Sequence, residues 1–251
     1  MVERISENRL RYLAGKKNFN LIYLEKDYFL TALLYMIKDV KEIYFKGGTA
    51  LNKIFLNHTR LSEDLDFSCR GSSISEIKSQ IIMTLNENRN FFTKYEFDKK
   101  SKLFFRIKAF YKSNFSENGY IILDVNKKSK LYLKPEKAYV PHFYEKIPKF
   151  KVNILNPKEI FAEKVRSLIM RNRPRDYFDV YMILKRGYKI DYDLVEKKLR
   201  DAGEIFEVRR IFKNARKIYS FWSSEVNQLT NEPVKYETVI RELQREFGYK
   251  V

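Results

Sequence analysis

The chain has 251 residues, 44% of them hydrophobic, and its 50 Lys and Arg exceed its 32 Asp and Glu to give a net charge of +18. This predicts a folded protein with one large or two modest domains, and the charge favours polyanionic partners, although lysine is also a common solubilising residue. The single cysteine, Cys69, excludes an internal disulfide, and two histidines argue against a classical zinc site. Because no apolar signal core and no run of about 18 apolar residues is present, we expect a cytoplasmic protein with no membrane partner.

Short elements are predicted for the first part of the chain. Apolar residues at helical intervals predict an amphipathic helix from Tyr23 to Met36. The next predicted elements are a strand over Ile43 to Phe45 that two glycines stop, a helix over Thr49 to Phe55, a strand LDFSC over 65–69, a helix over 74–90, and strands over 102–111 and 120–128 with a turn at 116–119 between them.

The second part of the chain is predicted to be helical. Asn156 is suited to cap a helix that starts at Pro157, with Glu159 reaching back to the cap. We expect this helix to end near Arg171 and a second helix to follow over 176–185.

The change of pattern near Phe150 predicts two domains. An α/β domain over 1–150, with a small mixed sheet and flanking helices, is followed by a helical domain over 151–251. We therefore expect an α+β fold with its site in the cleft between the two parts.

Two acids at the start of the strand LDFSC indicate a metal site. Asp64 comes directly before this segment and Asp66 lies within it. Side chains at i and i+2 of a strand share one face, so Asp64 and Asp66 are predicted to lie side by side while Leu65 and Phe67 face the core. Neighbouring carboxylates repel each other unless a cation or a proton lies between them. Mg²⁺ is the natural occupant, because it prefers oxygen ligands and is usually held by one or two carboxylates plus substrate phosphates. A solvated strand face is the alternative interpretation.

Gly47 and Gly48 come directly before the helix predicted to open at Thr49. Residues without a Cβ let the backbone approach a triphosphate closely, and amide N–H groups at a helix start can bind phosphate. Taken alone, the pair also suits a tight turn. Together with the acid pair it predicts a nucleotide site in which Gly47, Gly48 and Thr49 hold phosphates.

The segment KGGTALNKIF…RLSEDLDFS resembles the opening signature of the AbiEii/AbiGii-type toxins, also called MenT-type, of the DNA polymerase β-like nucleotidyltransferase superfamily. That superfamily's pattern is a glycine followed by Gly, Ser or Thr and then an Asp-x-Asp pair, matched here by Gly48-Thr49 and by Asp64 with Asp66. The downstream segment EIFAEKVRSLIMRNRPRDYFDVYMIL resembles the helical segment of the same family. The resemblance implies a Mg²⁺-dependent nucleotidyltransferase that uses an NTP.

The downstream segment contributes further candidate residues. Lys164 lies beside the apolar stripe of its predicted helix with Arg171 on the same side, so both could contact a triphosphate. The resemblance implies that Lys164 and Asp176 match polar positions of the family's active site, where Asp176 positions a group or acts as a base. An ion pair joining the two helices is the alternative, and for Asp179, which shares a helix face with Asp176, both interpretations stay open.

Asp124 is a lone acid in an otherwise apolar predicted strand. The superfamily often supplies a third carboxylate from a neighbouring strand, which makes Asp124 a candidate metal ligand next to Asp64 and Asp66. A charge that protects an edge strand against aggregation is the alternative.

The expected reaction is transfer of a nucleoside monophosphate from an NTP to an acceptor. Family resemblance and charge favour RNA, with the 3′ end of tRNA as the acceptor, in a toxin that a cognate antitoxin protein neutralises. The alternatives are a nucleotidyltransferase that modifies a protein and a non-catalytic basic protein that binds nucleic acid.

Overall fold

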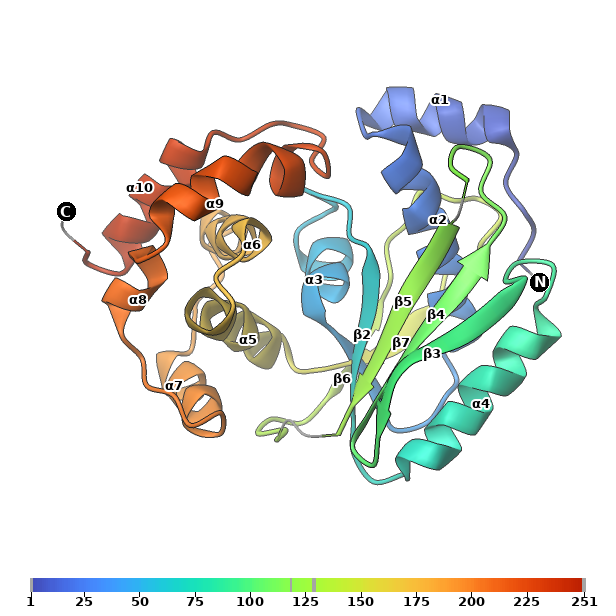
Figure 1. Ribbon diagram of the computed structural model, residues 1–251, viewed down its shortest axis with the longest axis horizontal. Coiled ribbons are helices and arrows are strands. Elements are labelled where there is room, and N and C mark those ends of the chain that lie inside the picture. Colours follow the sequence, from blue (N-terminus) through green and yellow to red (C-terminus); the bar gives the residue numbers. More distant parts are fainter. Residues whose placement is uncertain (1, 118, 128–129, 250–251) are drawn as a thin grey trace.

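The centre of the fold is a seven-stranded mixed sheet of order β3-β4-β5-β2-β1-β7-β6, seen in a computed structural model that describes residues 2–117, 119–127 and 130–249 (Figure 1). The strands are β1 Ile43–Lys46, β2 Asp64–Cys69, β3 Lys94–Ser101, β4 Phe104–Tyr111, β5 Gly119–Asn126, β6 Glu136–Tyr139 and β7 Lys151–Ile154. Strand β2 pairs antiparallel with β1 and parallel with β5, so the acid-bearing strand lies in the middle of the sheet. The predicted α+β fold is confirmed.

Helices flank this sheet and then continue to the end of the described chain. They are α1 Glu7–Lys17, α2 Leu21–Met36, α3 Gly47–Ala50, α4 Ile74–Glu87, α5 Pro157–Met170, α6 Pro174–Lys185, α7 Tyr192–Arg200, α8 Val208–Phe212, α9 Ala215–Trp222 and α10 Tyr236–Glu246, with π-helical turns η1 Leu51–Phe55 and η2 Ser223–Asn227. Figure 1 shows α3 between the sheet and the group formed by α5 to α10, and α3 contacts both β2 and α5. No described helix is long and apolar enough to cross a membrane.

The central strands alternate between a buried face and a more open face. On β2, Leu65 and Phe67 are buried, and the Phe67 ring lies 5.4 Å from that of Phe45 on β1. The open face carries the polar side chains, and the strand register sets one row of them side by side across β1, β2, β5 and β4: Lys46, Asp66, Asp124 and Arg106. The predicted alternation on β2 is therefore observed.

The start of α5 confirms one sequence signal and corrects another. Asn156 caps the helix through its side chain, and Pro157 occupies the first turn. Glu159 does not reach back to the cap, because its buried carboxylate accepts the backbone N–H groups of 132–133 and lies 2.7 Å from the Lys198 ammonium. A buried acid needs such partners, and this requirement outweighs the capping bond.

Other elements differ from the sequence interpretation. The helix predicted from Thr49 starts at Gly47 and continues as a π-helical turn, and α1, β3, β6 and β7 were not predicted. The predicted turn over 116–119 includes Asn118, which lies outside the described residues. Strand β7 follows residue 150, and the division into domains 1–150 and 151–251 stays a prediction.

Candidate active site

Strand β2 holds Asp64 and Asp66 on its open face, where both side chains are partly buried. Neither carboxylate forms a hydrogen bond or ion pair with any residue that the structure describes. Unpaired carboxylates inside a protein are costly, since burial penalises the charged form. Burial raises the pKa of Asp64 to about 6, and the negative charges of Asp66 and Glu63 add to this effect.

The glycine pair lies directly against these acids. Gly47 has φ +75°, a conformation that L side chains rarely adopt, and a Cβ on it would lie 2.2 Å from Oδ2 of Asp66. A Cβ on Gly48 would lie 2.7 Å from Nη2 of Arg60 and 3.6 Å from Nζ of Lys164. Glycine is therefore needed at 47 for both conformation and space, and the turn brings its backbone up to the acid pair.

The Thr49 side chain contacts the backbone of β2. Its hydroxyl is buried and donates a hydrogen bond to the backbone carbonyl of Asp64. The side chain thus holds the start of β2 against α3. Lys46 at the cap position forms no side-chain hydrogen bond to the N–H groups at the helix start.

The acid pair fits a divalent cation, which would supply the positive charge that Asp64 and Asp66 lack. Burial raises the pKa of Asp66, and nearby Lys46 only opposes this shift. Among the described residues no group of three or more His, Cys, Asp and Glu side chains is placed to hold a metal ion. A magnesium site nevertheless usually takes only one or two carboxylates from the protein. Water and substrate phosphates supply its other ligands.

Asp124 is the neighbour of Asp66 in the sheet register, on the same open face. Its carboxylate is engaged by Arg106 on β4, with Nε to Oδ1 at 2.8 Å and Nη2 to Oδ2 at 2.7 Å. Such a two-point bond is among the stronger ion pairs in proteins. The sheet therefore places a third acid beside the pair, but in a neutralised form.

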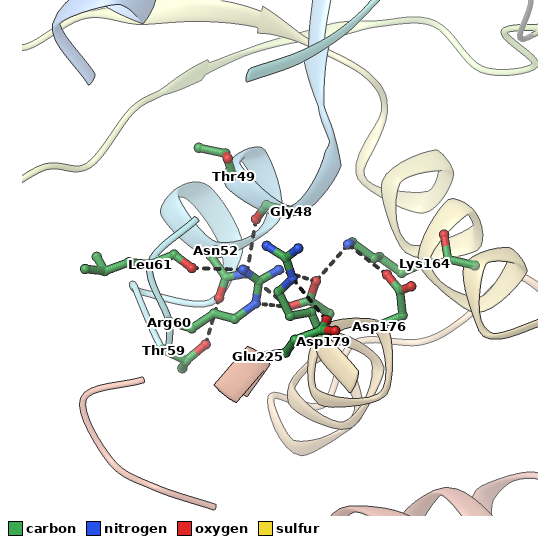
Figure 2. Close-up of polar contacts among 12 residues, drawn as sticks. Gly48, Thr49, Asn52, Thr59, Arg60, Leu61, Lys164, Asp176, Asp179 and Glu225 are labelled. Atoms are coloured by element: carbon green, nitrogen blue, oxygen red, sulfur yellow. Dashed lines mark hydrogen bonds and ion pairs between the residues drawn. The ribbon is translucent and has the colours of Figure 1, made fainter. Parts of the chain in front are cut away.

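On the helical side of the site, both carboxylate oxygens of Asp179 are bound by neighbouring side chains (Figure 2). Arg60 donates hydrogen bonds to this carboxylate from Nε at 2.8 Å and from Nη2 at 2.7 Å, and Lys164 Nζ lies 2.8 Å from it. Asn52 donates from 3.1 Å and also donates to the Gly48 carbonyl. Arg60 and Lys164 lower the pKa of Asp179 well below its usual value despite the opposing effect of burial.

Asp176 forms the second half of this network. Arg171 binds its carboxylate at 2.8 and 2.7 Å, and Lys164 Nζ lies 3.5 Å away. Burial opposes ionisation, but Lys164 and Arg171 together lower the pKa of Asp176. The Arg171 side chain is 54% exposed whereas that of Lys164 is 6% exposed, so Arg171 presents the more accessible cation. The ion pair between helices that the sequence left open is thus present.

These two groups face one small cavity. It is lined by Gly48, Arg60, Ser62, Asp64, Asp66, Lys164, Arg171, Arg173, Arg175 and Asp176. The structure therefore brings together most of the predicted site residues from β2, the glycine turn, α5 and α6. The Thr49 hydroxyl points to the backbone instead, and Asp124 lies one strand away from the acid pair.

The sequence interpretation missed the pairing of Lys46. Its ammonium lies 3.2 Å from Glu163 on α5, and Glu163 also lies 3.1 Å from the buried Lys198. Burial opposes ionisation of Glu163, yet Lys46 and Lys198 lower its pKa to about 2. Lys46 is thereby held on Glu163, and Asp66 beside it in the register stays unpaired. The signal available in the sequence was Glu163, an acid directly before the candidate residue Lys164.

A mixed sheet with a glycine turn beside an Asp-x-Asp strand defines a nucleotidyltransferase-like protein. Residues 28–246 match the family described as nucleotidyl transferase AbiEii toxin, Type IV TA system, and the chain belongs to this family of nucleotidyltransferase enzymes. No curated protein matches the sequence.

Solved structures share the fold at low sequence identity. MenT4, a nucleotidyltransferase toxin from Mycobacterium tuberculosis H37Rv, is similar with a TM-score of 0.67 and 18% identity over 98% of this chain and 89% of that one. JHP933 from Helicobacter pylori gives a TM-score of 0.59 and 17% identity over 92% of both chains. A nucleotidyltransferase described as putative, also from H. pylori, gives 0.58 and 18% over 90% and 93%.

Proposed function

We propose that this enzyme transfers a nucleoside monophosphate from an NTP to an RNA acceptor, the 3′ end of tRNA, in the cytoplasm. By inhibiting growth in this way it would act as a toxin that a cognate antitoxin counteracts. Family membership supports the transferase and toxin parts of the proposal. The net charge of +18 supports RNA as acceptor, because a basic surface attracts polyanions.

In this proposal Asp64 and Asp66 hold Mg²⁺, which would neutralise the triphosphate and orient it for attack. The backbone N–H groups of Gly47 and Gly48 bind phosphate oxygens, and Arg171 adds a partly exposed cation. Lys164 contributes positive potential from its buried position between the two acids of α6. The single observation that carries the proposal is the unpaired acid pair against the glycine turn.

The reaction forms a bond between the acceptor hydroxyl oxygen and the α-phosphorus and breaks the bond from that phosphorus to the bridging oxygen, so pyrophosphate leaves. Asp176 is a positioning residue in this scheme, because its lowered pKa and its bonds to Arg171 make it a poor base. Thr49 positions Asp64 through the backbone. Asp124 is the candidate for a third ligand or for accepting the hydroxyl proton, and either role requires it to release Arg106 at least in part.

Purified protein incubated with Mg²⁺, each α-³²P-labelled NTP and total RNA tests the proposal. We expect label at RNA 3′ ends with wild type and none with Asp64→Ala. Asp124→Asn should lower the rate by about 10²- to 10⁴-fold if this residue accepts the hydroxyl proton. Label on a polypeptide band would show a protein acceptor, and equal RNA labelling by wild type and Asp64→Ala would contradict the assigned site.

A further inference from the structure

A basic hollow of about 740 Å³ lies between the end of α5 and α8, next to the candidate active site. Four cations line it, Arg171, Arg209, Arg210 and Lys213, against one acid, Glu207. The volume is within the range of ligand-binding sites in proteins. The excess of positive charge makes the hollow a site for an anionic partner.

Part of this positive charge is not neutralised by the protein. Lys213 forms no ion pair with any described residue, and the Arg209 side chain is 80% exposed with only a 3.3 Å contact to Glu207. Arg210 is paired with Glu204 at 2.6 Å, so it contributes less. Exposed ion pairs of this kind are weak and are readily exchanged for phosphate.

The hollow has a fixed shape, because Asn172 joins α5 to α8. Asn172 has φ +55°, and its amide donates to the carbonyls of Leu168, Arg210 and Ile211. Its side-chain oxygen accepts the hydroxyl of Tyr177 at 2.7 Å. These bonds hold the backbone of α8 in place relative to the end of α5, which reduces the ordering that binding would require.

Arg171 lines both the hollow and the cavity that contains Asp64 and Asp66. Its guanidinium is held by Asp176, and its side chain is about half exposed. The hollow and the cavity are therefore adjacent at this side chain. The exposed Met170 and the ring of Tyr249, stacked on Phe212 at 4.5 Å, offer apolar contacts for nucleobases.

We propose that this hollow binds the last nucleotides of a single-stranded nucleic acid whose 3′ hydroxyl is the acceptor. The inference rests on the proposed function and adds the place where the acceptor enters. Lys213 and Arg209 contact phosphates, and Arg171 marks the passage into the active site. An acidic protein segment is the competing occupant and is an outcome of the test.

The test compares charge reversals inside and outside the hollow. Binding of a 12-nucleotide RNA, labelled with fluorescein at its 5′ end, is measured by anisotropy at several salt concentrations for Arg209→Glu/Lys213→Glu. The control is Lys102→Glu/Lys149→Glu, which changes the net charge equally at two exposed lysines outside the hollow. We expect the first variant to bind at least about tenfold more weakly, with a salt slope smaller by about 1.4, since each phosphate contact to a single strand contributes about 0.7.

Equal weakening in both variants would overturn the inference, because it would show a general charge effect. Unchanged RNA affinity together with lost labelling of a polypeptide would assign the hollow to a protein acceptor and also overturn it. The proposed function is tested separately by label incorporation with Asp64→Ala. RNA affinity is measured without NTP, so a failure of catalysis and a failure of the hollow are distinguishable.

Discussion

Two pairs of aspartates lie at the cavity, which Asp64, Asp66 and Asp176 line, and their surroundings differ completely. On β2, Asp64 and Asp66 have no partner among the described residues, and burial raises the pKa of both. On α6, Asp176 and Asp179 are fully buried, yet cations hold their pKa values low. The first pair forms no ion pair with a described residue, whereas each acid of the second pair forms ion pairs with two cations.

The contrast teaches that residue type and burial do not define a site by themselves. A buried acid that is paired with cations stabilises the fold, because removing it would leave those buried cations without a counter-charge. An unpaired acid in the same cavity is a cost to the fold, and it is the group from which we infer a role in chemistry. Substitutions that separate stability from activity can test this division.

The largest expected effect is on activity. Asp66→Asn keeps the shape of the side chain but removes a charge that forms no ion pair with any described residue. We expect the rate of label incorporation to fall at least about 10³-fold, the scale at which key electrostatic groups act in active sites. The thermal unfolding midpoint without metal should stay equal or rise. A destabilised Asp66→Asn protein would break the comparison.

The opposite result is expected on α6. Asp179→Asn leaves the buried Arg60 without its counter-charge and Lys164 with Asp176 alone, so urea unfolding should show a loss of about 3–5 kcal/mol. Asp193→Asn, at an exposed position on α7, is the matched control and should stay within about 0.5 kcal/mol. Wild-type stability in Asp179→Asn would show that the network is not structural.

A pH series sharpens the comparison on the β2 side. The pKa of Asp64 is raised from 3.8 to about 6, so between about pH 4 and pH 6 the folded protein holds a proton that the unfolded chain has lost. The free energy of unfolding without metal should therefore receive a contribution from Asp64 that falls as pH rises through this window. Mg²⁺ competes with that proton, so added Mg²⁺ should raise the unfolding midpoint at pH 7.5 and have little effect at pH 5. Asp64→Asn should remove this difference, and its persistence in that variant would place the metal elsewhere.

The smallest effect concerns the contact between α3 and β2. Thr49→Val removes the hydroxyl that donates to the Asp64 carbonyl, which should cost about 1 kcal/mol in urea unfolding. Thr49→Ser keeps the hydroxyl and serves as the control. Equal stability of the two variants would mean that this bond does not position the strand.

The sequence predicted the β2 side of the site better than the helical side. Alternation alone placed Asp64 and Asp66 on one face of a strand, because that period is local. The partner of Asp179 could not be found in this way, since Arg60 lies 119 positions away in the sequence. Only the packed fold decides which cation meets which acid.

The missed strands have a similar explanation. Strand β3 is an exposed edge strand without a hydrophobic period, and charged residues such as Lys99 and Lys100 are typical of edges that resist further pairing. Strand β6 is four residues long and lies at the opposite edge of the sheet.

The alternation on β2 has a consequence for how this protein can vary over evolutionary time. Leu65 and Phe67 anchor the strand in the core from one side, while Asp64 and Asp66 project from the other. A one-residue insertion or deletion inside the strand would exchange these sides, so hydrophobic groups would meet water and charges would enter the interior. Descendants can therefore change Asp64 or Asp66 by single substitutions and keep the scaffold, but a length change within this strand disturbs both of its faces at once.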